Sequence, residues 1–251
     1  MSIIKDFVAL NRKCSRSLEE KFPQSFGPDL PSYRDELLSR ISAGIKRGAV
    51  TRVLEIGGID RPLLRKGSGF IYDGMDIETK DTCFNIYDKF IVQPVEKMQL
   101  TDTYDSIISI TLLEHVTDNR SGIDRIFLSL TPGGEMHHYV PSKWHPYAVA
   151  LRLVGPILQK KLIPVLRPGA ESVSGYPAYF DHCTIPAMRR LLTERGFTDI
   201  RIKAFFRAND YFAFFTPLFI LVTFFENICR RLDLNIFASG FVFSARKRIN
   251  A

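Results

Sequence analysis

The sequence predicts a doubly wound α/β fold, built on a seven-stranded and mostly parallel sheet. Short β-branched runs alternate along the chain with segments of helical apolar spacing, as in strands joined by crossover helices. The first run, at 51–56, ends in Gly57-Gly58 and shows no polar alternation, which is typical of a strand buried on both faces. With 251 residues, 45% of them apolar, the chain is long enough to bury a full core.

Before the sheet, residues 1–49 are predicted to form a separate N-terminal helical segment. The second half of this segment places apolar residues at helical spacing: Leu37, Leu38, Ile41 and Ile45. Gly48 follows at the position of a C-terminal helix cap. Three prolines and a glycine at 22–31 predict a loop between two helices.

Residues 50–142 hold the first five predicted strands. Their ranges are 51–56, 70–76, 90–95, 106–111 and 136–141. Apolar spacing between the last two predicts a helix at 118–130, which Pro132-Gly133-Gly134 ends.

Residues 143–180 interrupt the alternation and are predicted to be an inserted helical lid, with helical stretches at 147–157 and 162–166. Residues 181–251 then complete the core. A helix is predicted at 184–195, between a Thr184 N-cap and a Gly196 stop, and two strands at 199–206 and 239–246.

Composition argues against several classes of protein. No stretch reaches the roughly 18–20 apolar residues of a membrane-spanning helix, and the N-terminus lacks the pattern of a secretory signal. The four cysteines lie far apart without a CxxC pair, which indicates reduced thiols in a cytoplasmic protein. The net charge of +7 comes from scattered basic pairs without interleaved aromatic residues, so no nucleic-acid partner is expected.

The first strand and its turn are coupled by spacing to Asp76, at the end of the second strand. A glycine at the end of a first parallel strand lets a ligand approach the backbone, and an acidic residue about 20 positions later can bind both ribose hydroxyls. Gly57 and Asp76 lie 19 positions apart. The alternative is a plain turn at Gly57-Gly58 and a solvated strand end at Asp76.

Five short motifs occur in one order: Glu55-Ile-Gly57, Tyr72-Asp-Gly-Met-Asp76, Tyr104-Asp105, Leu113-Glu-His-Val116 and Leu130-Thr-Pro-Gly-Gly134. This order resembles the class I S-adenosylmethionine-dependent methyltransferases. It is most similar to the branch with ubiquinone-biosynthesis O-methyltransferases and other small-molecule or lipid methyltransferases. The resemblance covers about 50–142 and implies a Rossmann-like methyltransferase fold, with that segment as the cofactor-binding core and S-adenosylmethionine as the cofactor.

The resemblance also implies which residues bind the cofactor: Glu55, Gly57, Gly58, Asp76, Ile77, Val95, Glu96, Thr111 and Leu112. The first three would line its methionine part. Asp76 would bind the ribose hydroxyls, and Ile77 would pack against the adenine. Val95 and Glu96 would lie near the adenine amino group, while Thr111 and Leu112 would face the sulfonium and the substrate.

The sequence departs from the family pattern at the first turn. Ile59 and Arg61 replace two further glycines, although Arg61 could itself pair with the methionine carboxylate. The acidic residue of the family after the third strand falls on Pro94, and only 60–66 remain for the helix after the turn. A second hypothesis is therefore a non-catalytic relative that binds a partner or a membrane surface. A third, a nicotinamide-dependent dehydrogenase, fits the spacing to Asp76 but not the later motifs.

Methyl transfer to a hydroxyl calls for a base near the acceptor. His145, after the fifth predicted strand, and His182, where the insertion returns to the core, are the candidate catalytic residues, each with a structural role as its alternative. His115 beside Glu114 resembles a metal-associated pair of the quinone O-methyltransferases. The further upstream acidic position of that set is Thr111 here, so no metal is expected.

The stretch 211–225 has no charged residue and holds six of the 20 phenylalanines between Phe212 and Phe225. It could be a buried helix that packs on a second subunit, which would make a homodimer. It could also be an apolar pocket wall, or a peripheral membrane contact through 211–231 with Arg230-Arg231 at the headgroups. The expected function is methyl transfer to a small apolar or lipid-linked acceptor, at a hydroxyl.

Overall fold

The computed structural model describes residues 2–59, 61–67, 69–166 and 176–249. The chain divides into two compact units, each made of three separate segments. The sheet unit consists of Pro31–Pro141, Tyr179–Lys203 and Phe241–Ala251. The helical unit consists of Met1–Leu30, Ser142–Ala178 and Ala204–Gly240.

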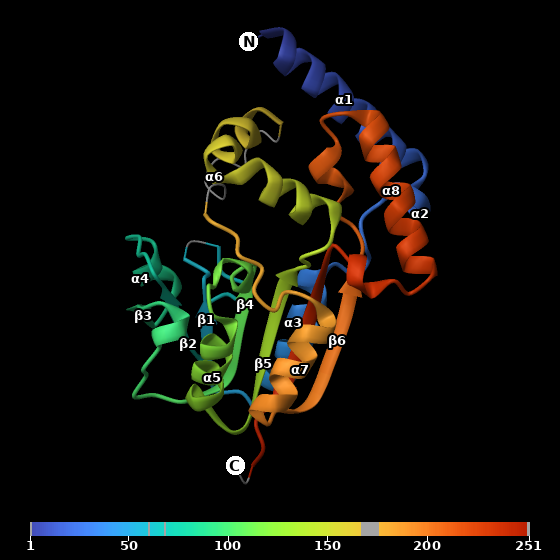
Figure 1. The fold of residues 1–251 in the computed structure, drawn as a ribbon. Coiled ribbons are helices and arrows are strands. Elements are labelled where there is room, and N and C mark those ends of the chain that lie inside the picture. The colour runs from blue at the N-terminus through green and yellow to red at the C-terminus, as the bar shows by residue number, and fades with distance from the viewer. Residues whose placement is uncertain (1, 60, 68, 167–175, 250–251) are drawn as a thin grey trace. The chain divides into compact units, whose positions relative to one another are not determined.

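The sheet has seven strands, as predicted. They are β1 (Arg52–Ile56), β2 (Ile71–Asp76), β3 (Lys89–Val92), β4 (Tyr104–Ile110), β5 (Leu130–Pro141), β6 (Thr198–Phe205) and β7 (Gly240–Arg246). Their order in the sheet is β3-β2-β1-β4-β5-β7-β6, and the pairs from β3 to β5 are parallel (Figure 1). This is the Rossmann-like α/β fold that the sequence predicts.

Helices cover both faces of the sheet. Figure 1 shows α5 (Asn119–Ser129) and α7 (Ile185–Arg195) on one face and α3 (Tyr33–Lys46) on the other. Ser32 and Asp35 form a capping box at the start of α3, and the predicted Thr184 cap begins α7. Three short helices complete the unit: α4 (Cys83–Ile86), η1 (Val95–Lys97) and η2 (Leu113–His115).

Two predicted strand boundaries differ from the structure. The third strand ends at Val92 rather than 95, because Pro94 has no N–H for the ladder and Val95 begins η1. The fifth strand starts at Leu130, six residues before the predicted start at 136. The Pro-Gly-Gly segment lies inside it, where Gly133 donates a hydrogen bond to the Lys247 carbonyl at 3.0 Å.

The helical unit holds α1 (Ser2–Lys21), α2 (Pro23–Phe26), α6 (Pro146–Leu166), η4 (Asn209–Phe212), α8 (Thr216–Arg231) and η5 (Asn235–Phe237). The range α6 consists of two helical stretches that meet at Gly155, whose backbone is not helical, so two stretches are present as predicted but with a different boundary between them. The short helix α2 lies in the predicted loop at 22–31. Part of the predicted insertion, 167–175, lies outside the described residues.

The two compact units group the chain differently from the four predicted segments, which stay a prediction. Within the predicted N-terminal segment 1–49, residues 1–30 belong to the helical unit and 31–49 to the sheet unit. The Phe-rich helix α8 belongs with the insertion after β5 rather than with the sheet. Within the ranges the structure describes, no helix is long and apolar enough to cross a bilayer.

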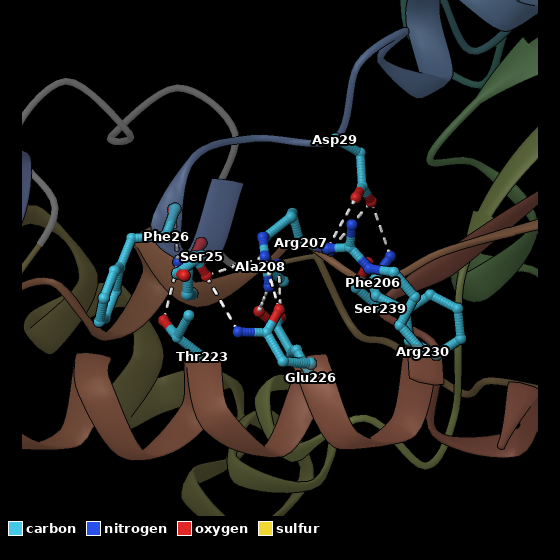
Figure 2. Close-up of polar contacts among 12 residues, drawn as sticks. Ser25, Phe26, Asp29, Phe206, Arg207, Ala208, Thr223, Glu226, Arg230 and Ser239 are labelled. Carbon is cyan, nitrogen blue, oxygen red and sulfur yellow. Dashed lines mark hydrogen bonds and ion pairs between the residues drawn. The ribbon is translucent and has the colours of Figure 1, made fainter. Parts of the chain in front are cut away.

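A buried polar network joins two segments of the helical unit, Met1–Leu30 and Ala204–Gly240 (Figure 2). The Glu226 carboxylate of α8 is fully buried, accepts a hydrogen bond from Ala208 N–H at 2.7 Å and lies 3.5 Å from the Arg207 guanidinium. Arg207 in turn donates to the carbonyls of Ser25 and Gly27 at 2.9 and 2.8 Å. These contacts tie α8 to the loop before it and to the segment after α2.

Candidate functional site

The order of the strands identifies one edge of the sheet as the candidate site. From β1 the chain continues outward to β2 and β3 on one side, and it returns to β4 on the other. Ligands of open parallel sheets bind beyond the carboxyl ends of the strands at such a reversal. Ile56, the last residue of β1, pairs with Met75 of β2 and Ser109 of β4, so Gly57, Asp76 and Thr111 follow three adjacent strand ends.

The turn after β1 leaves no room for side chains. Gly57 has a φ of +84°, and a Cβ there would lie 3.1 Å from Leu112 Cδ1. A Cβ at Gly58 would lie 2.3 Å from the Tyr87 hydroxyl and 2.8 Å from Glu55 Cδ. The backbone therefore packs directly on Leu112 at the start of the loop after β4 and on the buried Tyr87 and Glu55 side chains, so only glycine fits at these two positions.

Two β-branched residues at this edge adopt the left-handed conformation. Ile59 has a φ of 39° and Thr111 a φ of 52°. Such a backbone is unfavourable for β-branched side chains and is found preferentially at functional sites. At Ile59, where the sequence lacks a family glycine, the chain keeps a backbone conformation that glycine favours.

Glu55 is directed into the interior of the sheet unit. Its carboxylate accepts hydrogen bonds from Leu63 N–H at 3.0 Å, from the Tyr72 hydroxyl, and from the Tyr87 hydroxyl at 3.4 Å. Burial raises the pKa of the Glu55 carboxyl to about 7, although these hydrogen bonds lower it. Through Leu63, the Glu55 carboxylate thus fixes the segment that follows the turn. In the family pattern this segment is a full helix, which the chain lacks here. The contact of Glu55 with the methionine part of the cofactor stays a prediction.

Asp76 is the last residue of β2, and its carboxylate is half-buried. Its Oδ1 accepts hydrogen bonds from Ile77 N–H at 2.6 Å and Glu78 N–H at 3.3 Å, which fix its orientation. Burial raises the pKa of the Asp76 carboxyl above its usual value. A carboxylate offers about four acceptor positions, so these two bonds leave capacity for a pair of hydroxyls. The Ile77 side chain is exposed beside it.

Val95 and Glu96 lie in η1, after β3. Val95 is buried against α5, where a Cβ at Gly122 would lie 3.6 Å from Val95 Cγ1. Glu96 Oε1 accepts hydrogen bonds from the N–H and hydroxyl of Thr117 at 3.3 and 3.2 Å, which ties η1 to the loop after β4. Glu96 is thus the polar side chain of this pair, and its contact with a cofactor stays a prediction.

The burial of the Glu114 carboxyl, in η2, is a feature that sequence reasoning missed. Glu114 is 5% exposed, and within the described residues its Oε2 has no hydrogen-bond partner. Burial raises the pKa of the Glu114 carboxyl to about 8, so it is largely protonated at neutral pH. No group of three or more His, Cys, Asp or Glu that could bind a metal is found in the described ranges.

The segment that leads into His182 is hydrogen-bonded to η2, which follows β4. Tyr179 and Phe180 N–H both donate to the Glu114 carbonyl, at 2.8 and 3.0 Å. His182 Nδ1 lies 2.8 Å from Asp181 Oδ1, and Asp181 Oδ2 accepts a hydrogen bond from Asn119 N–H at 2.9 Å. A fixed carboxylate on Nδ1 orients the ring and makes Nε2 the basic nitrogen. Asp181 adjoins His182 in the sequence, and that adjacency was the available signal for the pair.

His145 belongs to the helical unit and is fully buried there. Its Nε2 lies 3.1 Å from Glu226 Oε1, and its Nδ1 accepts a hydrogen bond from Tyr147 N–H at 3.2 Å. Both ring nitrogens are therefore engaged, and the ring links the start of α6 to α8. This is the geometry of the structural alternative, and a catalytic role for His145 stays a prediction.

Comparison with known proteins gives one family and a set of structures. A family model described as a methyltransferase domain matches residues 26–202. The chain is similar to phosphoethanolamine N-methyltransferase 2 from Haemonchus contortus, in complex with phosphomonomethylethanolamine and S-adenosylhomocysteine. The TM-score is 0.51 at 14% identity, over 98% of this chain and 60% of that one, which is less than two thirds of its length.

Two further structures have the same fold. A SAM dependent methyltransferase from Archaeoglobus fulgidus gives a TM-score of 0.51 at 15% identity, over 92% of this chain and 98% of that one. The [4+2]-cyclase SpnF also gives 0.51, at 13% identity, over 86% and 81%. At these identities the likeness shows the fold alone. No curated protein matches the chain.

Proposed function

This chain belongs to the methyltransferase domain family, and we propose that it methylates a hydroxyl of a small apolar or lipid-linked acceptor. The family match covers more than half of the chain, at 26–202. The chain is accordingly an S-adenosylmethionine-dependent methyltransferase, with S-adenosylmethionine as its cofactor. Membership in the small-molecule and lipid branch, the hydroxyl and the apolar acceptor are the proposed parts.

The observation that carries the proposal is the arrangement at the ends of β1, β2 and β4. Gly57 and Gly58 present bare backbone, and Asp76 presents an oriented carboxylate one strand away. These groups fit a ligand with a ribose diol and an amino-acid part. When bound, S-adenosylmethionine supplies a methyl group already activated by a positively charged sulfur, so positioning and exclusion of water provide most of the acceleration.

His182 is assigned as the base of the proposed reaction. Asp181 holds the Nδ1 side of the ring, so Nε2 can take the hydroxyl proton of an acceptor. S-adenosylmethionine would supply the methyl group for the acceptor oxygen, and the protein's part would be to take up the proton that the hydroxyl loses. The proton ends on His182 Nε2. Thr111, whose strained backbone follows β4, would face the reacting methyl group.

An apolar acceptor is proposed from the composition of the helical unit. The Phe-rich helix α8 and the inserted segment after β5 belong to the same compact unit. The chain leaves the sheet for this unit at Pro141, the carboxyl end of β5, and the substrate loops of such sheets start at the carboxyl ends of their strands. A unit rich in phenylalanine that begins there favours an apolar acceptor.

The cofactor site is tested by calorimetric titration with S-adenosylhomocysteine. We expect the wild-type protein to bind, and Asp76→Ala to weaken binding tenfold or more because two charge-assisted hydrogen bonds to the ribose are lost. Asp81→Ala removes an exposed carboxylate from the loop after β2 and serves as the matched control. Absence of a binding signal from the wild-type protein would contradict the assignment.

The acceptor is tested with S-adenosylmethionine carrying an isotope-labelled methyl group and a total lipid extract as substrate. We expect label in the organic phase, with a methyl carbon shift in the NMR spectrum typical of a methyl ether. A methyl group bonded to nitrogen or carbon would refute the hydroxyl. Label confined to water-soluble products would refute the apolar acceptor and leave the cofactor site intact.

A further inference from the structure

Exposed large apolar side chains are concentrated in the helical unit. Of the 28 such residues within the described part of the chain, 21 belong to this unit, which holds fewer than half of all residues. Scattered single exposed apolar residues are ordinary, whereas their gathering on one part of a molecule marks a contact surface.

Helix α8 is apolar on opposite faces. One of these faces is buried in the helical unit and consists of Phe219, Val222 and Cys229. Leu221, Phe224 and Ile228 are all more than half exposed, and their spacing of three and four residues aligns them along one side. Packing within the helical unit therefore leaves one apolar side of α8 exposed.

Helix α1 repeats this pattern. Ile3, Phe7 and Leu10 recur at spacings of four and three, and each is at least half exposed. Phe7 stacks on the partly exposed Phe215 at the start of α8, with ring centroids 6.3 Å apart, and α1 runs beside α8 in Figure 1. Each of the two helices thus carries an exposed apolar face, and the residues of both faces together are called the apolar helix surface: Ile3, Phe7, Leu10, Leu221, Phe224 and Ile228.

The net charge of the helical unit indicates which kind of partner fits the apolar helix surface. The helical unit carries 13 Lys and Arg against eight Asp and Glu, and so supplies +5 of the net charge of +7. Exposed basic residues flank the apolar side chains, among them Lys5 and Lys13 on α1 and Arg231 at the end of α8. Apolar side chains bordered by cations complement a bilayer with anionic headgroups, where the apolar groups enter the acyl boundary and the cations stay at the phosphates.

We propose that the apolar helix surface docks the helical unit onto an anionic lipid bilayer as a peripheral contact. The surface includes part of the predicted contact at 211–231 and extends it to α1. It does not depend on the chemistry proposed for the sheet unit, because none of its residues belongs to the candidate cofactor site.

The test is co-sedimentation with vesicles of phosphatidylcholine alone or mixed with phosphatidylserine. We expect the wild-type protein to bind the mixed vesicles, and added salt to weaken binding by screening the headgroups. Phe224→Glu should lower the partition coefficient tenfold or more. Phe84→Glu on α4 of the sheet unit is the matched control, since Phe84 is 68% exposed and Phe224 is 62% exposed, and it should bind as the wild type does.

Three results would overturn the proposal. The wild-type protein could fail to bind mixed vesicles, or Phe224→Glu could bind them as well as Phe84→Glu does. The wild-type protein could also sediment as a dimer that Phe224→Glu dissociates, without vesicle binding by either protein, which would assign the surface to a second copy of this chain. The fluorescence of Trp144, which lies in the helical unit, verifies that Phe224→Glu is folded.

Discussion

At the scale of single residues, His145 and His182 differ because their surroundings differ. His145 has a partner at each ring nitrogen and is fully buried, so it acts as a link between two helices. His182 is held at one nitrogen by Asp181 and is partly exposed, which fits its proposed role as a base. In the sequence, Asp181 beside His182 is a local signal of this difference, whereas the Glu226 partner of His145 lies 81 positions away and is brought near it only by the fold.

Glu114 shows how burial alone changes the state of a residue. The pKa of its carboxyl is raised from 4.5 to about 8 in the folded protein by loss of hydration. Between these pH values the folded state holds a proton that the unfolded state releases. The stabilising contribution is therefore fully present below pH 4.5 and is lost as pH rises through 8.

We therefore expect the free energy of unfolding to fall from pH 5 to pH 8, and Glu114→Gln to flatten this dependence by about 3 kcal/mol. Glutamine keeps the shape of the neutral carboxylic acid and does not titrate. Urea denaturation at several pH values measures the effect, with Glu20→Gln, an exposed residue of α1, as the control. A Glu114→Gln profile that parallels the wild type would show that the carboxyl is not neutral in the folded state.

At the scale of elements, the strands were predictable because a parallel strand buried on both faces has few acceptable sequences. All seven predicted strands are present, and β1 and β4 match their predicted ranges within two residues. The start of β5 was predicted wrongly, because its Pro-Gly-Gly segment is typical of a turn when read locally. Its pairing with residues after β7, more than 100 positions later, overrides that local preference.

The strained turn at the candidate site was harder to predict than the strands around it. Gly57 and Asp76 were found by spacing, since both depend on local residue type. The left-handed backbone of Ile59 was not, because sequence preference argues against it and tertiary contacts enforce it. The two-sided character of α8 was also hidden, since the apolar residues between 217 and 225 fall on every side of the helix and cannot tell a buried face from an exposed one.

At the scale of the whole molecule, the division into two units could not be read along the chain. Each unit is assembled from three segments that are far apart in the sequence. The sequence predicts separate N-terminal, lid and C-terminal segments. It does not show that α1, α6 and α8 share one core, because the contacts that join them involve single buried polar residues rather than a pattern.

Glu226 carries these joining contacts, and its loss should affect one unit only. The carboxylate bonds to His145 from the insertion and to Ala208 N–H, and it pairs with Arg207, which binds the segment after α2. Glu226→Ala leaves these buried groups without their partner and should destabilise the helical unit by about 3 kcal/mol. Trp144, the single tryptophan, lies in this unit and reports its unfolding through fluorescence in urea.

The affinity for S-adenosylhomocysteine reports on the folding of the sheet unit, as Trp144 fluorescence does for the helical unit. All nine predicted cofactor residues belong to the sheet unit, so Glu226→Ala should lower the midpoint of the Trp144 transition without changing this affinity at low urea. Glu194→Ala, which breaks an exposed ion pair with Arg120 in the sheet unit, should leave the Trp144 midpoint where it is in the wild type. Loss of S-adenosylhomocysteine binding together with the Trp144 signal would instead mean that the two units fold as one, because a single cooperative transition couples every part of the structure.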